Sequence, residues 1–315
     1  MEFNARIAGI KIKFSGELGG EFLNRVKPYR DYFNTPDVTV LYKLTDNVII
    51  PEDRQDIKQV SDRTWFYHNG KFCFADFNEQ INKYVLFVSI VPDTVEITVY
   101  DLKDEDEIEL INEALREYKK LAPNIKERAA AENASFNRDC LLLNSTDQAV
   151  HYVLLYHKVL EIHASAIAVN GEGIIFSAPS GTGKSTQTAL WEKYYKATII
   201  NDDSPLISAD ADSVLLHGSP WAGTTGINKN MSVPLKAVIF LKQAPENTLS
   251  PLTTLQALQF LLRELLMPCD RQLIDNVYTL LNLVLASVPC YLLSCTPERE
   301  AADIVYDELF GKERL

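Results

Sequence analysis

The stretch FSAPSGTGKST, residues 176–186, decides how the second half of the chain folds. Gly181 and Gly183 precede a lysine, Lys184, and two hydroxyl residues. Apolar residues with strand character lead into this turn, and a helical pattern, QTALWEKYY, follows it. Glycines at a strand-to-helix turn let several backbone N–H groups converge on phosphate groups at the positive end of the helix. The stretch therefore predicts a phosphate-binding loop.

The loop predicts roles for its residues. Lys184 is expected to reach the β- and γ-phosphates of ATP, and the Ser185 hydroxyl is expected to bind Mg²⁺. Ala178 stands where the usual motif begins with glycine, and a methyl group is tolerated there if the backbone keeps a negative φ. The expected nucleotide-binding residues are Ser180, Gly181, Thr182, Gly183, Lys184, Ser185 and Thr186.

Two neighbouring carboxylates, Asp202 and Asp203, follow the segment ATIIN, residues 197–201, which has strand character. Their distance from Lys184 fits one short helix and a return to the sheet. At the carboxyl end of a strand, one carboxylate can hold Mg²⁺ and the other can accept a proton from an attacking hydroxyl. The alternative is a turn or helix cap before Pro205. Because a phosphate loop precedes the pair, we favour the catalytic interpretation.

The segment HASA, residues 163–166, is expected on a strand. Together with the Asn170-Gly171 turn, the loop and the aspartates, it resembles HPr kinase/phosphorylase. These segments resemble the nucleotide core of ATP-type phosphoenolpyruvate carboxykinase more distantly, and HPr-kinase homologues of bacterial peptide-modification clusters most closely. The resemblance covers about residues 161–242. It implies that Asp202 is the general base, that Asp203 is its metal-side neighbour with Ser185, and that His163 lies near the transferred phosphoryl group.

One region departs from this family. HPr kinases carry an arginine-glycine signature where this chain has HGSPW, residues 217–221, which contains no arginine. The departure argues against recognition of HPr and against phosphorylase activity. The following loop, 221–230, has two interpretations. It is either a lid, with Lys229 near the phosphoryl group and Trp221 stacking on a ligand, or an ordinary connection.

The composition limits the classes of partner. The chain has 315 residues, 46% of them hydrophobic, and a net charge of −12, which disfavours nucleic acid and anionic membranes. Five cysteines without a CxxC pair indicate reduced thiols, and the N-terminus has no signal-peptide pattern, so we predict a cytoplasmic protein. The apolar run 277–295 is interrupted by Pro289 and predicts a helix followed by a strand rather than a membrane span.

The domain organisation follows from a change in composition. Residues 1–125 contain many strand patterns, which predict an antiparallel sheet. We expect them to form a β-rich α+β domain that positions the substrate. Residues 126–139 are the predicted linker. Residues 140–315 are predicted to be a mixed α/β, phosphate-loop kinase domain of the HPr kinase/phosphoenolpyruvate carboxykinase type, beginning with a helix capped at Ser145, Thr146 or Asp147.

These observations predict an ATP- and Mg²⁺-dependent kinase that transfers the γ-phosphoryl group to a hydroxyl, with a serine of a protein or peptide as the expected acceptor. A small-molecule kinase and a nucleotide-gated binding protein without phosphoryl transfer are the alternatives. A carboxykinase is disfavoured, because the chain is short for that family and lacks a recognisable metal-ligand cluster. HPr kinases assemble as hexamers, so the resemblance raises a homo-oligomer as one option.

Overall fold

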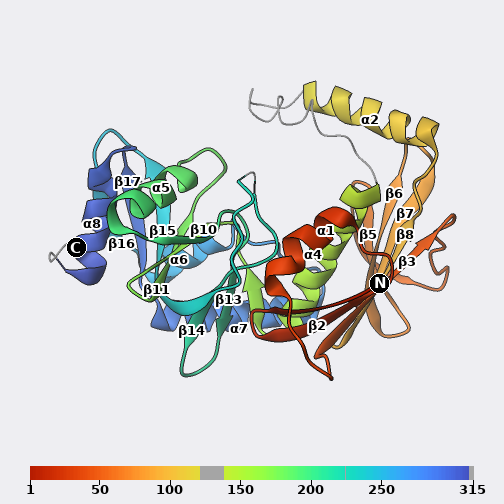
Figure 1. Ribbon diagram of the computed structural model, residues 1–315, viewed down its shortest axis with the longest axis horizontal. Helices are drawn as coiled ribbons and strands as arrows, with labels where there is room; N and C mark the ends of the chain where they lie inside the picture. The colour runs from red at the N-terminus through yellow and green to blue at the C-terminus, as the bar shows by residue number, and fades with distance from the viewer. Residues whose placement is uncertain (121–137, 224, 312–315) are drawn as a thin grey trace. The chain divides into compact units, whose positions relative to one another are not determined.

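The computed structural model describes residues 1–120, 138–223 and 225–311, and its chain divides into two compact units (Figure 1). Unit 1 comprises residues 1–5 and 11–153, and unit 2 comprises residues 6–10 and 154–315. Each unit contains one β-sheet, so the protein has a mixed α/β architecture. Most of the predicted linker 126–139 lies outside the described residues.

Unit 1 is built on an eight-stranded sheet with the order β1-β2-β3-β8-β7-β6-β5-β4. Strands β2, β3 and β8 pair in parallel, whereas β8, β7, β6, β5 and β4 pair antiparallel through short turns. The prediction of a purely antiparallel sheet was therefore wrong, because β3 is inserted between β2 and β8, two strands distant in the sequence. The strands are β1 (Glu2–Ile7), β2 (Ile10–Ser15), β3 (Val38–Thr45), β4 (Gln55–Val60), β5 (Arg63–His68), β6 (Lys71–Asn78), β7 (Lys83–Val91) and β8 (Thr94–Tyr100).

Helices complete unit 1. Rings of the sheet pack edge-on against Tyr152 of α4, with centroid distances of 5.4 Å for Phe72 and 5.9 Å for Phe74. The predicted cap at residues 145–147 was wrong, because α4 already begins at Arg138. The hydroxyls of Ser145 and Thr146 instead donate to carbonyls one turn earlier in the helix. The helices are α1 (Gly20–Val26), the 3₁₀ helix η1 (Lys27–Tyr29), α2 (Glu105–Lys120) and α4 (Arg138–Tyr156).

Unit 2 contains a nine-stranded mixed sheet. Its main path is β12-β10-β11-β15-β14-β13-β9, and β17 pairs with both β15 and β16. The Asn170-Gly171 turn has the positive φ angles, 53° and 79°, that a two-residue hairpin turn between β10 and β11 requires. The strands are β9 (Val159–Glu161), β10 (Ser165–Val169), β11 (Glu172–Ser177), β12 (Thr198–Asn201), β13 (Leu206–Ala209), β14 (Val214–His217), β15 (Ser232–Gln243), β16 (Thr248–Pro251) and β17 (Cys290–Cys295).

The core of unit 2 includes an aromatic cluster between α5 and α8. The rings of Tyr195 and Tyr306 stack with centroids 4.2 Å apart, and the Trp191 ring lies 6.0 Å from that of Tyr306. The apolar run 277–295 forms a helix and then a strand, as its proline predicts. Among the described residues, no helix is both long and apolar enough to cross a bilayer. The helices are α5 (Lys184–Tyr195), α6 (Thr254–Leu261), α7 (Arg271–Ser287) and α8 (Arg299–Phe310).

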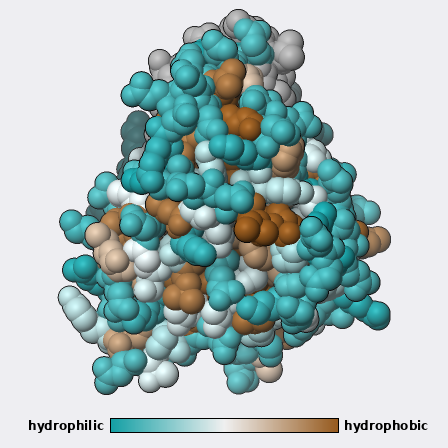
Figure 2. Space-filling view, turned by 90° about the vertical axis from the view of Figure 1, so that its right-hand side faces the viewer, coloured by the Kyte–Doolittle hydropathy of each residue, from teal (hydrophilic) through white to brown (hydrophobic). Residues whose placement is uncertain are grey.

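Polar residues cover most of the face drawn in Figure 2, whereas large hydrophobic side chains lie in the two cores. The face drawn in Figure 2 is mostly hydrophilic, and its apolar residues form separate patches. Large aromatic side chains such as Phe66, Phe176 and Trp191 are fully buried. The hydrophobic residues thus mainly stabilise the two cores.

Strand β10 determines which loops of unit 2 meet. It pairs antiparallel with β11 on one side and with β12 on the other, so β11 and β12 run in the same direction. Ser165 at the start of β10 lies opposite Phe176 near the end of β11, and Ala166 lies opposite Asn201 at the end of β12. The loop after β11 and the aspartates after β12 therefore emerge at the same edge of the sheet.

A buried histidine in this sheet predicts a pH-dependent stability. His217 on β14 is 5% exposed, and its ring nitrogens lie 2.8 Å from Ser208 Oγ and 2.7 Å from Ser232 Oγ. Burial lowers the pKa of His217 from 6.5 to about 4. Below pH 6.5 the unfolded chain therefore binds a proton that the folded chain does not, and the stabilisation present above this pH is lost as the pH falls.

Replacing the titrating ring tests this linkage. We expect lowering the pH from 7 to 5 to destabilise the wild type by about 2 kcal/mol more than His217→Gln, as measured by scanning calorimetry. The control, Gln59→Met on the exposed strand β4, removes no titrating group and should leave the pH dependence of the wild type unchanged. An identical pH dependence for His217→Gln and the wild type would contradict a buried neutral imidazole.

Candidate active site

The turn between β11 and α5 has the backbone geometry that the sequence predicts. Gly181 and Gly183 have φ angles of 80° and 121°, which L-residues with side chains rarely adopt, and a Cβ atom at either position would meet no atom within 4 Å. Helix α5 begins at Lys184 without a side-chain cap. The first N–H groups of an α-helix have no intrahelical acceptor, so those of α5 remain available for an anion.

Lys184 lies at the centre of the side-chain contacts. Its Nζ donates to the loop carbonyl of Ala178 at 2.6 Å and lies 2.8 Å from His163 Nε2. Since an ammonium group only donates, Nε2 accepts and the imidazole proton is on Nδ1. His163 Nδ1 lies 4.0 Å from Asp203 Oδ1. The structure thus brings together three residues predicted from the sequence.

The charge of Lys184 is affected by its surroundings. Partial burial lowers the pKa of its ammonium group, and the nearby carboxylates of Glu264 and Asp203 oppose this effect. Because Lys184 is partly buried, its ammonium group has lost part of its hydration before any ligand binds. Its charge therefore interacts more strongly with a phosphate than the charge of a fully hydrated surface lysine does.

Asp202 is turned toward a different set of donors. Its carboxylate accepts hydrogen bonds from the backbone N–H groups of Gly223 at 2.7 Å and Thr225 at 3.1 Å, and from the Thr225 hydroxyl. A side chain at Gly223 would crowd this approach, since a Cβ there would lie 3.2 Å from Asp202 Oδ2 and 3.1 Å from Asp203 Cβ. The two neighbouring carboxylates therefore have separate environments.

Asn201 fixes the turn that carries both aspartates. This fully buried side chain accepts from the backbone N–H groups of Asp203 at 2.9 Å and Ser204 at 2.7 Å. Its amide nitrogen donates to the carbonyls of Ser219 at 3.2 Å and Trp221 at 2.9 Å. One side chain thus joins the aspartate turn to the start of the loop 221–230.

His163 and Trp221 lie differently from their predicted positions. His163 is not within a strand but in a bend before β10, where its backbone N–H donates to Glu264 O at 2.9 Å. This bend exposes the imidazole to the site. Trp221 is only 4% exposed, so its ring packs inside unit 2 and is not presented to a ligand. The structure therefore does not support the suggested stacking role of Trp221.

A cavity of about 290 Å³ opens beside the loop. Gln187 of α5 is 1% exposed, and its Oε1 accepts no hydrogen bond from the described residues. Gln243 at the end of β15 donates from its amide to Gly181 O at 3.2 Å and so supports the loop. The cavity is lined by Thr182, Gly183, Thr186, Gln187, Gln243, Ala244, Cys295, Thr296 and Pro297.

Sequence analysis missed several residues that shape the site. Glu264 follows α6 and lies far from the loop in the sequence, with no motif around it. Gln187 lies between Thr186 and Thr188, and Gln243 follows Lys242, so neither glutamine stands out from its polar neighbours in the sequence. Asn201 directly precedes the aspartates. Because asparagine side chains often bond to the backbone of a turn, its position could have indicated a structural role.

The fold and the site define a mixed α/β protein with a glycine-rich loop, a lysine and two aspartates at one edge of a sheet. A family model described as SynChlorMet cassette protein ScmC matches residues 131–298, just over half of the chain. The chain belongs to this family.

The structure of the Hpr(Ser) kinase/phosphatase from Coxiella burnetii is similar to this chain with 11% sequence identity and a TM-score of 0.29. The match covers 47% of this chain and 87% of that one. No curated protein matches the chain.

The contacts of Asn201 predict a large effect on stability. Replacing Asn201 by alanine leaves two backbone N–H groups without their acceptor and opens a buried space, so we expect unit 2 to lose at least about 2 kcal/mol of stability. Scanning calorimetry checks this loss. The control Asn47→Ala, at an exposed position, should change stability by less than about 0.5 kcal/mol. Equal melting of wild type and Asn201→Ala would show that the aspartate turn is held by other contacts.

Proposed function

We propose that this protein is an ATP-dependent kinase that transfers the γ-phosphoryl group to a hydroxyl group, with a serine of a protein or peptide as the acceptor. The observation that carries the proposal is the meeting of the glycine-rich loop, Lys184 and the two aspartates at one sheet edge. A phosphoryl donor needs positive groups, and an attacking hydroxyl needs a base. This edge supplies both kinds of group.

The loop suits the triphosphate of the donor. The available N–H groups at the start of α5 and the ammonium group of Lys184 supply the positive potential that phosphate oxygens require. In the proposed complex, Lys184 exchanges its contacts with Ala178 and His163 for phosphate oxygens. His163 then lies beside the phosphates, as the resemblance to HPr kinases implies.

The donor set also fits Mg²⁺. The exposed Ser185 hydroxyl follows Lys184 in the first turn of α5, and Asp203 contributes a partly exposed carboxylate. Mg²⁺ bound with a nucleotide uses one or two protein oxygens together with phosphates and water, and Ser185 and Asp203 are the side chains that would hold it. When bound, Mg²⁺ would neutralise charge on the phosphates.

Asp202 is the proposed base for the acceptor. Its carboxylate already accepts a hydrogen bond from one hydroxyl, that of Thr225. An acceptor serine that takes the place of the Thr225 hydroxyl would make the same contact. Asp202 then receives the proton of the serine hydroxyl while the serine oxygen forms a bond to the γ-phosphorus, and the bond from this phosphorus to ADP breaks.

The role of Asp202 is tested by Asp202→Asn. An amide can still accept a hydrogen bond but cannot take up the proton, so phosphoryl transfer should fall about 10²- to 10⁴-fold while ATP still binds. Transfer of labelled phosphate from ATP to serine peptides and to a metabolite mixture measures the rate, and the labelled product identifies the acceptor class.

The matched control is Asp212→Asn in the exposed turn between β13 and β14, which should transfer phosphate at the wild-type rate. Wild-type turnover by Asp202→Asn would exclude this residue as the base. Absence of transfer by the wild type with any acceptor, together with ATP binding, would instead favour a nucleotide-gated binding protein.

The cavity beside the loop is the proposed position of the nucleoside. Its buried acceptor, Gln187 Oε1, matches an N–H donor such as the amino group of adenine. Replacing Gln187 by methionine keeps the volume and removes the acceptor, so affinity for ATP should fall about tenfold while thermal stability is retained or increased.

Calorimetric titration with ATP measures this change, and Gln59→Met on the exposed strand β4 is the control. ATP affinity that is the same for Gln187→Met and the wild type would place the nucleoside outside this cavity. That result would leave the proposed chemistry at Asp202 untouched.

A further inference from the structure

Thr225 lies at the position that the proposed function assigns to the acceptor hydroxyl. Its hydroxyl donates to Asp202 Oδ2, and its backbone N–H donates to the same oxygen at 3.1 Å. The Gly223 N–H donates to Asp202 Oδ1 at 2.7 Å, so both carboxylate oxygens of the proposed base accept hydrogen bonds from this segment. A hydroxyl that donates to a carboxylate is in the arrangement from which a general base removes its proton.

Contacts on both sides of Thr225 restrain its backbone. The side chain of Asn228 donates to Pro220 O at 3.0 Å, and the Gly226 N–H donates to Gly223 O at 3.2 Å. The Thr225 hydroxyl is therefore held near the base without the loss of entropy that a separate acceptor would suffer on binding.

The same base is connected to the groups that are proposed to hold phosphate. Asp202 and Asp203 are neighbours in one turn, and Asp203 Oδ1 lies 4.0 Å from His163 Nδ1. The other ring nitrogen of His163 lies 2.8 Å from Lys184 Nζ. A series of contacts thus leads from the lysine of the glycine-rich loop, through the aspartates, to the Thr225 hydroxyl.

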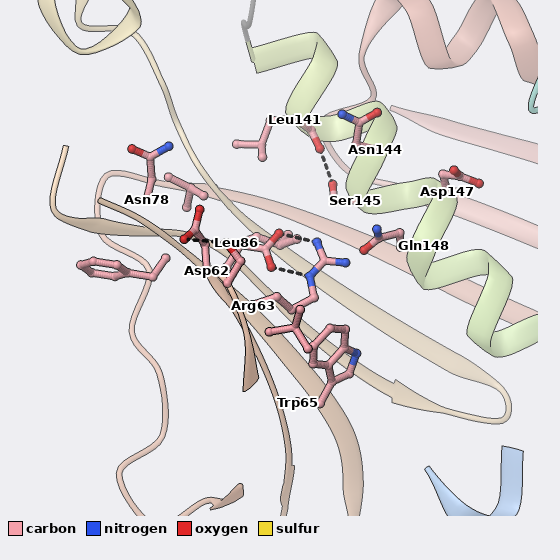
Figure 3. Close-up of a pocket in the computed structure, with 15 residues that line it drawn as sticks. Asp62, Arg63, Trp65, Asn78, Leu86, Leu141, Asn144, Ser145, Asp147 and Gln148 are labelled. Atoms are coloured by element: carbon pink, nitrogen blue, oxygen red, sulfur yellow. Dashed lines mark hydrogen bonds and ion pairs between the residues drawn. The ribbon is translucent and has the colours of Figure 1, made fainter. Parts of the chain in front are cut away.

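A hydroxyl beside a carboxylate in unit 1 lacks such surroundings. Ser61 donates to Asp62 Oδ1 at 3.2 Å, and both residues line a pocket of about 560 Å³. Figure 3 shows this pocket with Arg63, whose guanidinium already donates to Asp76 at 2.5 Å. The described lining residues include neither a lysine nor a glycine, so this pocket offers no counterpart of the loop that would hold phosphates.

A second hydroxyl of the candidate active site is that of Ser204. It donates to Asp203 Oδ2 at 3.2 Å, whereas Thr225 donates to Asp202. Asp203 is the proposed ligand of Mg²⁺, and a carboxylate bound to this ion is less available to take up a proton. The different partners of the two hydroxyls favour Thr225 as the acceptor.

We propose that Thr225 is itself phosphorylated by this site, an inference that rests on the proposed function. Asp202 takes the proton of the Thr225 hydroxyl, the Thr225 oxygen forms a bond to the γ-phosphorus of ATP, and the bond from this phosphorus to ADP breaks. Asp202 then releases the proton to water. Because the Thr225 oxygen no longer carries the proton and the new phosphate is repelled by the carboxylate, Asp202 becomes available to an external acceptor.

The experiment incubates the purified protein with Mg²⁺ and ATP labelled in its γ-phosphate, without an added acceptor. Proteolysis and mass spectrometry locate the label. We expect a single phosphate per chain, on Thr225. The labelling rate per chain should stay constant when the protein is diluted about tenfold, because the transfer is intramolecular.

Variants separate the hydroxyl from the rest of the loop. Thr225→Val keeps the branched shape and removes the hydroxyl, so labelling should fall at least about tenfold, whereas Thr225→Ser should still be labelled. Asp202→Asn should reduce labelling about 10²-fold. The control Thr248→Val, at an exposed position on β16, should be labelled as the wild type is. Melting curves verify folding, and if Thr225→Val fails to fold, the position of the label in the wild type decides.

Hydrogen exchange tests the contact without nucleotide. The Gly223 and Thr225 amides donate to Asp202, so both should exchange more slowly in the wild type than in Asp202→Ala, which lacks the acceptor. Equal exchange in the two proteins would overturn the proposal, because Thr225 would then not lie at the base.

Three labelling results would also overturn the proposal. These are a label on another residue such as Ser204, a rate per chain that falls on dilution, and undiminished labelling of Thr225→Val. A parallel reaction with serine peptides and a metabolite mixture distinguishes this failure from that of the proposed function. Label on an external acceptor but not on Thr225 contradicts this inference alone, whereas no label on any acceptor despite ATP binding contradicts both.

Discussion

The antiparallel pairing of β10 with both β11 and β12 is the constraint on which the candidate active site depends. Because β11 and β12 then run in the same direction, the glycine-rich loop and the aspartate turn leave the sheet at one edge. The bend before β10 brings His163 to that edge, within 2.8 Å of Lys184. A shift of this pairing by one residue would turn alternate side chains to the opposite face and separate these groups.

The site concentrates positive potential in a protein with a net charge of −12. Backbone N–H groups at the start of α5 and one partly buried lysine supply this potential, and several carboxylates surround them. Such a local arrangement favours a phosphate chain at one place without making the whole surface attractive to polyanions. It also keeps Asp202 and Asp203 in different environments, since donors of the loop 221–230 hold one and the turn beside His163 holds the other.

The sequence predicted the local parts of this arrangement well. Gly181, Gly183 and Lys184 lie within one short stretch whose backbone requirements can be read directly, and the strand before the aspartates was also evident. Glu264 and Gln243 were missed because they reach the loop only through tertiary contacts. Likewise, the parallel insertion of β3 beside β8 depends on packing and not on any local pattern. The predicted helix cap at 145–147 was wrong because α4 already begins at Arg138. The hydroxyls of Ser145 and Thr146 donate to carbonyls one turn earlier, whereas a cap hydroxyl accepts from backbone N–H groups.

The central claim is that this sheet edge binds a nucleoside triphosphate through Lys184 and the loop. Calorimetric titration of the purified protein with ATP in the presence of Mg²⁺ tests it most directly. The account predicts saturable binding at one site, lost in Lys184→Ala and retained in Lys193→Ala, which changes an exposed lysine of the same helix. No heat from any nucleoside triphosphate, or equal binding by Lys184→Ala and the wild type, would contradict it.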